Sequence, residues 1–292
     1  MTLESSLPAG ALASLAAMSN AIASLGIIAG NRALPLALAR EARAAGIARL
    51  VAVAFEGETD PNLAQLVDET VWLKVGQLDR MIRAFADRGI HHCVMVGQIA
   101  PKNLFDLRPD LRAVKMLWRL KEKNAQTLFG AIGEELEKEG VKLIEATPWL
   151  KTMMPDTGFR LGRALSSEEQ KDIAFGWRIA KEVSRLEIGQ TVVVKQGTVL
   201  AVEGFEGTDR CLTRGGELAG KGGGAVAVKV AKLKHDMRFD IPCVGAGTVE
   251  TCAKAGVSVL AFEAQTTLLL EREKVEALLA RDKMAMVAVR FE

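Results

Sequence analysis

Residues 24–146 alternate between short apolar runs and longer segments in which apolar residues recur at helical spacing. The apolar runs are 24–29, 50–55, 71–74, 91–96 and 141–146, and the helical segments are 35–46, 77–89, 109–123 and 125–140. Unbroken apolar strands are typical of a parallel sheet that is covered on both faces. The alternation therefore predicts a Rossmann-like α/β domain.

Residues 147–162 break this alternation with Pro148, Pro155, Gly158 and Gly162. A helix is predicted at 166–186, because Ser166 and Glu169 form a capping-box pair at its start. A hairpin at 191–203 turns at Gln196-Gly197. Further strands (225–232, 257–264) and helices (247–256, 271–281) predict a second, mixed α/β domain, with 215–224 as a flexible connector. We divide the chain into an extension at 1–23, a Rossmann-like domain at 24–150 and a catalytic α/β domain at 151–292.

Composition is that of an ordinary soluble globular protein, with 49% apolar and 25% charged residues. A net charge of +2 and an aromatic content of 5% give no support to nucleic-acid binding. The four cysteines form no CxxC pair, and we interpret them as reduced, buried residues of a cytoplasmic protein.

The N-terminus raises the question of export. Residues 1–23 contain no Lys or Arg and include Glu4, which argues against a signal peptide and favours an Ala-rich extension. No apolar run has the roughly 18–20 residues that a membrane span requires.

Two loops follow strands of the first predicted domain. One carries Gly30, Asn31 and Arg32, and the other carries Gly97 and Gln98. Such loops face the ligand crevice of an open parallel sheet, although a plain structural turn is the alternative for each. The first loop lacks the GxGxxG pattern of dinucleotide binding.

Residues 202–211 combine Glu203, Glu206, Thr208 and Asp209 with two glycines. Oxygen ligands of this kind suit a hard cation such as Mg²⁺. The alternative is a solvated acidic turn in which Thr208 caps the next helix.

Residues 234–240 read KHDMRFD. If the segment is extended, Asp236, Arg238 and Asp240 project on one face. Arginine can hold phosphate bidentately, and the aspartates can bind a metal or activate water. Lys229 and Lys232 precede the segment. A salt-bridged turn with Phe239 in the core is the alternative.

Together these motifs resemble a known family. IIAGNRALP, VMVGQIAPKNLFDLRPDLRA, EGFEGTD and VKVAKLKHDMRFDIPCVGAGTVE occur in the order found in the UDP-2,3-diacylglucosamine pyrophosphatases of the LpxI type. The resemblance runs from about Ser24 to the C-terminus.

The resemblance implies two α/β domains with an interdomain ligand cleft. It also implies hydrolysis of UDP-2,3-diacylglucosamine to UMP and 2,3-diacylglucosamine 1-phosphate in lipid A biosynthesis. The implied cofactor is Mg²⁺ (or Mn²⁺), and the implied state is a homodimer in the cytoplasm with peripheral contact to the inner membrane.

On this basis Asp236, Arg238 and Asp240 are the predicted catalytic residues. The metal would lie on Asp236, Asp240, Asp209 and Glu206. The predicted substrate-binding residues are Gly30, Asn31, Arg32, Gly97, Gln98, Thr208, Lys229 and Lys232.

One departure bears on activity, because Ala125-Gln126 stands where the family has an acidic pair at the start of a helix. A non-catalytic homologue that binds a nucleotide sugar or lipid is therefore an alternative. The Rossmann-like half alone leaves an NAD-dependent oxidoreductase as a further one.

Overall fold

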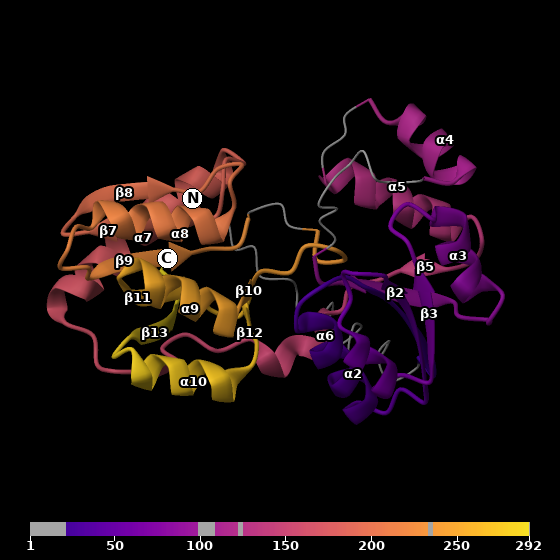
Figure 1. Cartoon of the computed structure of the whole chain (residues 1–292), viewed down its shortest axis with the longest axis horizontal. Coiled ribbons are helices and arrows are strands. Elements are labelled where there is room, and N and C mark those ends of the chain that lie inside the picture. The colour runs from indigo at the N-terminus through magenta and orange to yellow at the C-terminus, as the bar shows by residue number, and fades with distance from the viewer. Residues whose placement is uncertain (1–21, 99–108, 122–124, 233–235, 292) are drawn as a thin grey trace, which may run out of the picture. The chain divides into compact units, whose positions relative to one another are not determined.

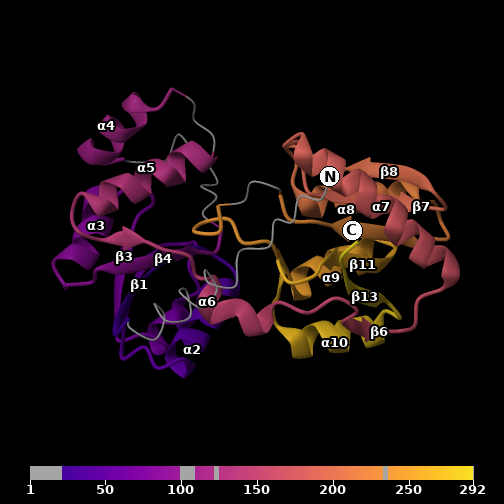
Figure 2. The same cartoon turned by 180° about the vertical axis from the view of Figure 1, so that it is seen from behind.

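A computed structural model describes residues 22–98, 109–121, 125–232 and 236–291 of the chain. The chain forms two compact units (Figures 1 and 2). The first unit contains residues up to Leu150 together with Asp236–Asp240, and the second contains Lys151–His235 and Ile241–Glu292. The short segment 236–240 thus leaves the second unit and packs with the first.

The first unit is built on a five-stranded parallel sheet of order β3-β2-β1-β4-β5. Its strands are β1 (Ser24–Ala29), β2 (Arg49–Phe55), β3 (Glu69–Leu73), β4 (His92–Val96) and β5 (Lys142–Leu143). The order reverses between β1 and β4, which is the switch point where open α/β sheets bind ligands. The Rossmann-like prediction is confirmed in architecture, although β5 is much shorter than the predicted 141–146.

Helices cover both faces of this sheet, as its continuous apolar strands require. In Figure 1, α3 and α5 lie on one side of the sheet, and α2 and α6 lie on the other. The helices are α2 (Leu34–Ala44), α3 (Leu78–Ala86), α4 (Leu111–Arg119), α5 (Ala125–Glu137) and α6 (Thr147–Leu150), with a short η1 (Pro61–Gln65). Apolar residues of β1, β2, α3, α4 and α5 form one continuous core.

The second unit contains a six-stranded mixed sheet of order β6-β13-β11-β9-β7-β8. These strands are β6 (Arg160–Gly162), β7 (Thr191–Lys195), β8 (Thr198–Val202), β9 (Ala225–Lys229), β11 (Val257–Glu263) and β13 (Ala285–Val289). Strands β9, β11 and β13 are parallel, and β7 joins β8 in the predicted hairpin. Strands β10 (Cys243–Val244) and β12 (Leu268–Leu269) form a separate pair.

The long helix α7 (Ser167–Arg185) packs on one face of this sheet, and α8 (Thr208–Leu218) and α9 (Ala246–Ala255) pack on the other. The capping box of Ser166 and Glu169 is present at the start of α7. Helices η3 (Lys151–Met153) and α10 (Arg272–Arg281) complete the unit.

The structure corrects two predictions of local conformation. Residues 215–218 belong to α8 and not to a flexible connector, because Gly215 and Gly216 are buried where a side chain would collide with Val193 and the Ala255 carbonyl. Residues 236–240 form a turn and not an extended strand, since the amide of Asp240 donates to the carbonyl of Asp236 at 3.1 Å.

Candidate functional site

A lysine lies buried at the carboxyl end of the central strand β9. Alternation along the strand places Lys229 on the face of Ala225 and Ala227, which pack beneath α8 and α9. Lys229 is only 8% exposed, and its Nζ donates to the carbonyl of Cys243 at 3.0 Å. It forms no ion pair with a carboxylate of the described residues. A buried cation of this kind is costly unless a counter-charge or ligand offsets it.

Two helices begin at the same edge of the sheet. Helices α8 and α9 each connect to a parallel strand, β9 and β11, so both start at the carboxyl ends of the strands. Their N-caps are Gly207 and Gly245, and among the described residues no side chain caps either end. The first-turn amides and the positive ends of the helix dipoles therefore accompany Lys229, which makes this edge suited to an anion.

Polar side chains hold the start of α8 in place. The hydroxyl of Thr208 donates to Glu203 at 3.0 Å and lies 3.5 Å from the hydroxyl of Thr191. Thr191 is the antiparallel partner of Lys229 in the sheet, so their side chains share one face. Thr208 and Lys229, both predicted to bind substrate, are thus brought to one edge.

The two acidic residues of the predicted metal turn differ in their surroundings. Glu206 forms an ion pair with Arg214 at 2.6 Å, which lowers the pKa of its carboxyl, and it also accepts the amide of Gly204. Asp209 is exposed in the first turn of α8.

The buried Cys252 thiol lies within electrostatic reach of both Asp209 and Lys229. Burial raises the pKa of this thiol to about 12, with Asp209 adding to the rise and Lys229 opposing it. Asp209 and Lys229 therefore act electrostatically on one neighbouring thiol, and that thiol stays protonated.

The turn at 236–240 holds an internal ion pair. Arg238 donates from Nε and Nη2 to the two carboxylate oxygens of Asp236, the shortest bond being 2.6 Å. This pairing lowers the pKa of the Asp236 carboxyl. Phe239 packs against Phe129 with ring centroids 5.4 Å apart. The structure therefore contains the alternative predicted for this segment, a salt-bridged turn with a packed Phe239.

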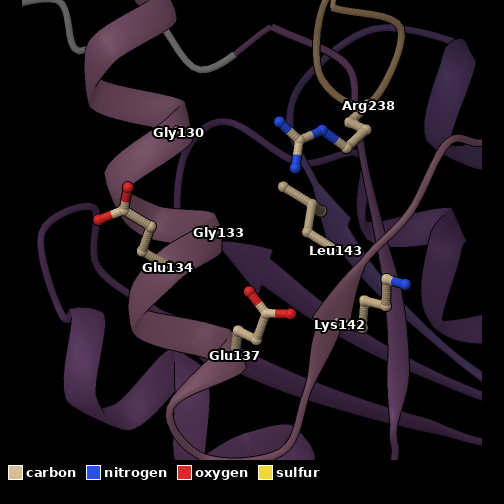
Figure 3. A pocket seen from close by; sticks show the side chains of 7 residues that line it. All are labelled: Gly130, Gly133, Glu134, Glu137, Lys142, Leu143 and Arg238. Atoms are coloured by element: carbon tan, nitrogen blue, oxygen red, sulfur yellow. The ribbon is translucent and has the colours of Figure 1, made fainter.

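Arg238 also lines a pocket inside the first unit (Figure 3). The pocket has a volume of about 220 Å³ and lies between α5 and β5. Figure 3 shows the guanidinium of Arg238 directed into this space, with Glu137 and Lys142 farther along it. The other lining residues are Gly130, Gly133, Glu134 and Leu143. Because Glu134 and Glu137 line the pocket together with Arg238 and Lys142, the lining is not purely cationic.

The two predicted loops of the first unit meet at the switch point of the sheet. Asn31 and Gln98 form an isolated bridge, with the Asn31 amide donating to the Gln98 carbonyl at 2.8 Å. A side chain at Gly30 or Gly97 would collide with the facing backbone, since a Cβ would lie 2.4 Å or 2.7 Å from a carbonyl oxygen. These glycines are needed for the contact between the loops.

Asn31 has one polar atom that the fold does not satisfy. Its Nδ2 donates to Glu58 at 2.9 Å, whereas its Oδ1 is buried and has no hydrogen-bond partner among the described residues. Arg32 beside it is exposed and has a φ of 66°. An unsatisfied acceptor at the switch point suits a ligand that donates a hydrogen bond.

The four predicted metal ligands divide between the two units. Asp236 and Asp240 belong to the first unit, and Glu206 and Asp209 belong to the second. Among the described residues no group of three His, Cys, Asp or Glu is arranged to hold a metal ion. The described residues of either unit taken alone therefore do not make a metal site, and we derive no step through a metal.

Some predicted features cannot be placed. Most of the N-terminal extension (1–21) and His235 lie outside the described residues. Lys232 is exposed three residues beyond Lys229.

Thr191 and the N-terminus of α9 were not predicted from the sequence to belong to the site. The Gly245-Ala246-Gly247 run after a short apolar pair is the signal that could have indicated the latter.

Fold and site together define a two-unit α/β protein whose second unit has a sheet edge with a buried lysine and two helix N-termini. Two family models cover nearly the whole chain, namely the LpxI N-terminal domain at residues 24–153 and the LpxI C-terminal domain at 156–287. The UDP-2,3-diacylglucosamine pyrophosphatase LpxI of Caulobacter vibrioides is 33% identical over 263 residues, which cover 87% of this chain and 92% of that protein. The chain belongs to the LpxI family.

Proposed function

We propose that this protein hydrolyses the pyrophosphate bond of UDP-2,3-diacylglucosamine, with UMP and 2,3-diacylglucosamine 1-phosphate as products. One water is consumed, and its oxygen ends on one of the two phosphates. The likeness of both halves of the chain to the LpxI family supports this activity. The observation in the structure that supports it best is the buried Lys229 beside two uncapped helix N-termini.

A diphosphate needs charge neutralisation before water can approach its phosphorus atoms. Lys229 provides a fixed cation, and the amides of α8 and α9 provide donors that need no reorganisation. Thr208 is held by Glu203 and presents its oxygen at the same edge. We assign Lys229 and Thr208 to the phosphate groups, with Lys232 as a further cation.

In the first unit, we assign the edge at Gly30, Asn31, Arg32, Gly97 and Gln98 to the nucleoside. The buried Oδ1 of Asn31 supports this assignment, because uracil and ribose both carry hydrogen-bond donors.

Asp236 and Asp240 keep the catalytic roles that the sequence predicts for them. The lowered pKa leaves Asp236 ionised at neutral pH, as a base or a cation ligand must be. Two of the three guanidinium nitrogens of Arg238 are committed to Asp236. In this arrangement Arg238 positions Asp236 instead of binding phosphate.

A divalent cation, Mg²⁺ or Mn²⁺, a homodimeric state and a cytoplasmic location remain part of the proposal, as does peripheral contact with the inner membrane. No helix among the described residues is long and apolar enough to cross a bilayer.

Incubation with UDP-2,3-diacylglucosamine tests the activity. We expect release of UMP with added Mg²⁺ and its loss with EDTA. UMP release that EDTA does not affect would contradict the metal requirement alone. Binding of the substrate without any UMP release would contradict the hydrolase and support a binding protein.

Replacement of Asp236 by Ala tests its catalytic role. We expect Asp236→Ala to abolish turnover while the circular dichroism spectrum and melting temperature remain close to the parent's. Asp282→Ala is the matched control, because Asp282 also pairs with a neighbouring arginine, Arg281. Parental kcat in the Asp236→Ala protein would remove Asp236 from the mechanism.

A further inference from the structure

Helix α4 carries large apolar side chains on its outer face. Trp118 is 86% exposed and Leu111 is 79% exposed. The two residues are seven positions apart, which is close to two helical turns, so they lie on one stripe. Lys115 stands between them, four residues after Leu111, and is exposed as well. We call Leu111, Lys115 and Trp118 the outer stripe of α4.

The opposite face of α4 is fixed to the first unit. Ala113 and Met116 are buried in the core shared with α3 and α5. Arg112 donates to Glu135 at 2.7 Å and pairs with Glu139 at 2.9 Å. The Asp110 carboxylate caps the helix by accepting the amide of Ala113 at 2.8 Å. The orientation of the helix is therefore set by its inner contacts, and the outer stripe faces solvent.

The outer stripe carries positive charge and no negative charge. Helix α4 contains no Asp or Glu. Lys115 has no carboxylate partner within ion-pair distance in the part of the chain that the structure describes, and Arg119 reaches only Glu135, at 3.7 Å. The Asp110 carboxylate is engaged in capping the helix, and those of Asp79, Glu135 and Glu139 pair with Arg112.

We propose that the outer stripe of α4 is the surface by which this protein contacts an anionic lipid bilayer. Tryptophan favours the boundary between water and hydrocarbon, and leucine enters the acyl region beside it. Lysine adjoining them is attracted to anionic headgroups. A second copy of this chain fits the stripe less well, because Lys115 and Arg119 of two copies would repel each other without acidic partners.

This inference rests on the proposed function, whose substrate carries two acyl chains and is therefore concentrated in membranes. A short helix with one tryptophan and one leucine gives modest, reversible binding and not permanent insertion. Such binding suits an enzyme that must reach a membrane-dissolved substrate and release a product.

Vesicle sedimentation tests the proposal with the full-length protein. The probes are vesicles of phosphatidylcholine alone and vesicles in which phosphatidylglycerol forms about half of the lipid. We expect the parent to sediment with the anionic vesicles and much less with the neutral ones. The double variant Leu111→Gln/Trp118→Gln should bind anionic vesicles about tenfold more weakly.

Leu218→Gln is the matched control, since Leu218 is 60% exposed on α8 of the second unit. It should bind vesicles as the parent does. The melting temperature of each variant shows that a loss of binding does not come from unfolding. Turnover of a short-chain, water-soluble substrate analogue should be equal in all three proteins.

Parental binding by the double variant would overturn the proposal. So would equal loss of binding in the Leu218→Gln control, or no binding of the parent to anionic vesicles. A dimer that dissociates in the double variant, seen by analytical ultracentrifugation, would assign the stripe to self-association instead. Absence of turnover with the soluble analogue would contradict the proposed activity and leave the vesicle result unaffected.

Discussion

The functional interpretation of Lys229 depends on its burial and its position in the folded protein. This lysine is a polar residue at the end of an apolar strand, and the sequence predicts it as a substrate-binding residue. Its burial and its position beside the starts of α8 and α9 are decided by the sheet order. A charge in that position is explained most simply by an anionic ligand.

Replacement of Lys229 by Met tests this interpretation. Loss of a charge-assisted contact with a phosphate should lower kcat/KM by roughly tenfold to a hundredfold. The melting temperature should not fall, because removal of a buried charge relieves its desolvation. Steady-state kinetics and thermal unfolding measure the two effects. The control Lys221→Met removes an exposed lysine of the same unit. An unchanged kcat/KM in Lys229→Met would exclude Lys229 from the phosphate site.

At the scale of elements, the position of α8 depends on small residues. A Cβ at Gly216 would lie 1.9 Å from the carbonyl oxygen of Ala255, at the end of α9. The backbones of the two helices can therefore approach closely only with glycine there. That approach brings the start of α8 to the sheet edge that carries Lys229.

Gly216→Ala should lower the free energy of unfolding by about 2 kcal/mol or more, because both helices must separate. Gly130→Ala is the matched change in α5, where a Cβ would meet no atom of the described residues within 4 Å. It should raise the free energy of unfolding by up to about 1 kcal/mol through helix propensity. Urea unfolding compares the two variants. Equal effects in both would show that the contact between α8 and α9 is not tight.

The attachment of α4 to α5 should depend on pH. Glu135 is buried, and Lys138 and then Arg112 lower the pKa of its carboxyl from 4.5. A lowered pKa in the folded state contributes stability that is present above pH 4.5 and is lost as the pH falls through the folded-state value.

Comparison of the parent with Glu135→Gln between pH 3 and pH 7 measures this contribution. We expect the parent to be more stable by on the order of 1 kcal/mol near neutral pH. The difference should shrink as the pH falls below about 4. A difference that stays constant across this range would mean that the ionised carboxylate contributes nothing.

At the scale of the whole molecule, the chain crosses between its two units more than once. The segment 236–240 lies within the sequence of the second unit but packs with the first. Phe239 attaches it by packing against Phe129 and the adjoining core. The boundaries predicted at 24–150 and 151–292 did not include this exchange.

Phe239→Ala should weaken the first unit although residue 239 is far along the chain. We expect a loss of about 2–3 kcal/mol from the lost packing. Amide hydrogen exchange should accelerate in α5 and stay unchanged in α8 and α9. Phe205→Ala is the control, because Phe205 is fully exposed. Acceleration in α8 and α9 with none in α5 would contradict the assignment of this segment to the first unit.

Much of the architecture follows from the sequence, because local spacing determines whether a segment becomes a strand or a helix. The apolar runs of the first sheet, the capping box at Ser166 and the Gln196-Gly197 hairpin were predicted on this basis. The small strand β6 was not predicted, because its pairing with β13 is a long-range contact.

For the candidate site, too, the residue types follow from the sequence and their arrangement follows from the tertiary structure. The sequence by itself indicated which residue types carry the chemistry, namely Asp236, Arg238, Thr208 and Lys229. Only the tertiary structure decided that Asp236 and Arg238 neutralise each other in a turn of the first unit, whereas Lys229 and Thr208 lie together in the second. The physical reason is that a strand or helix depends on neighbours along the chain, while burial and charge pairing depend on segments that meet only after folding.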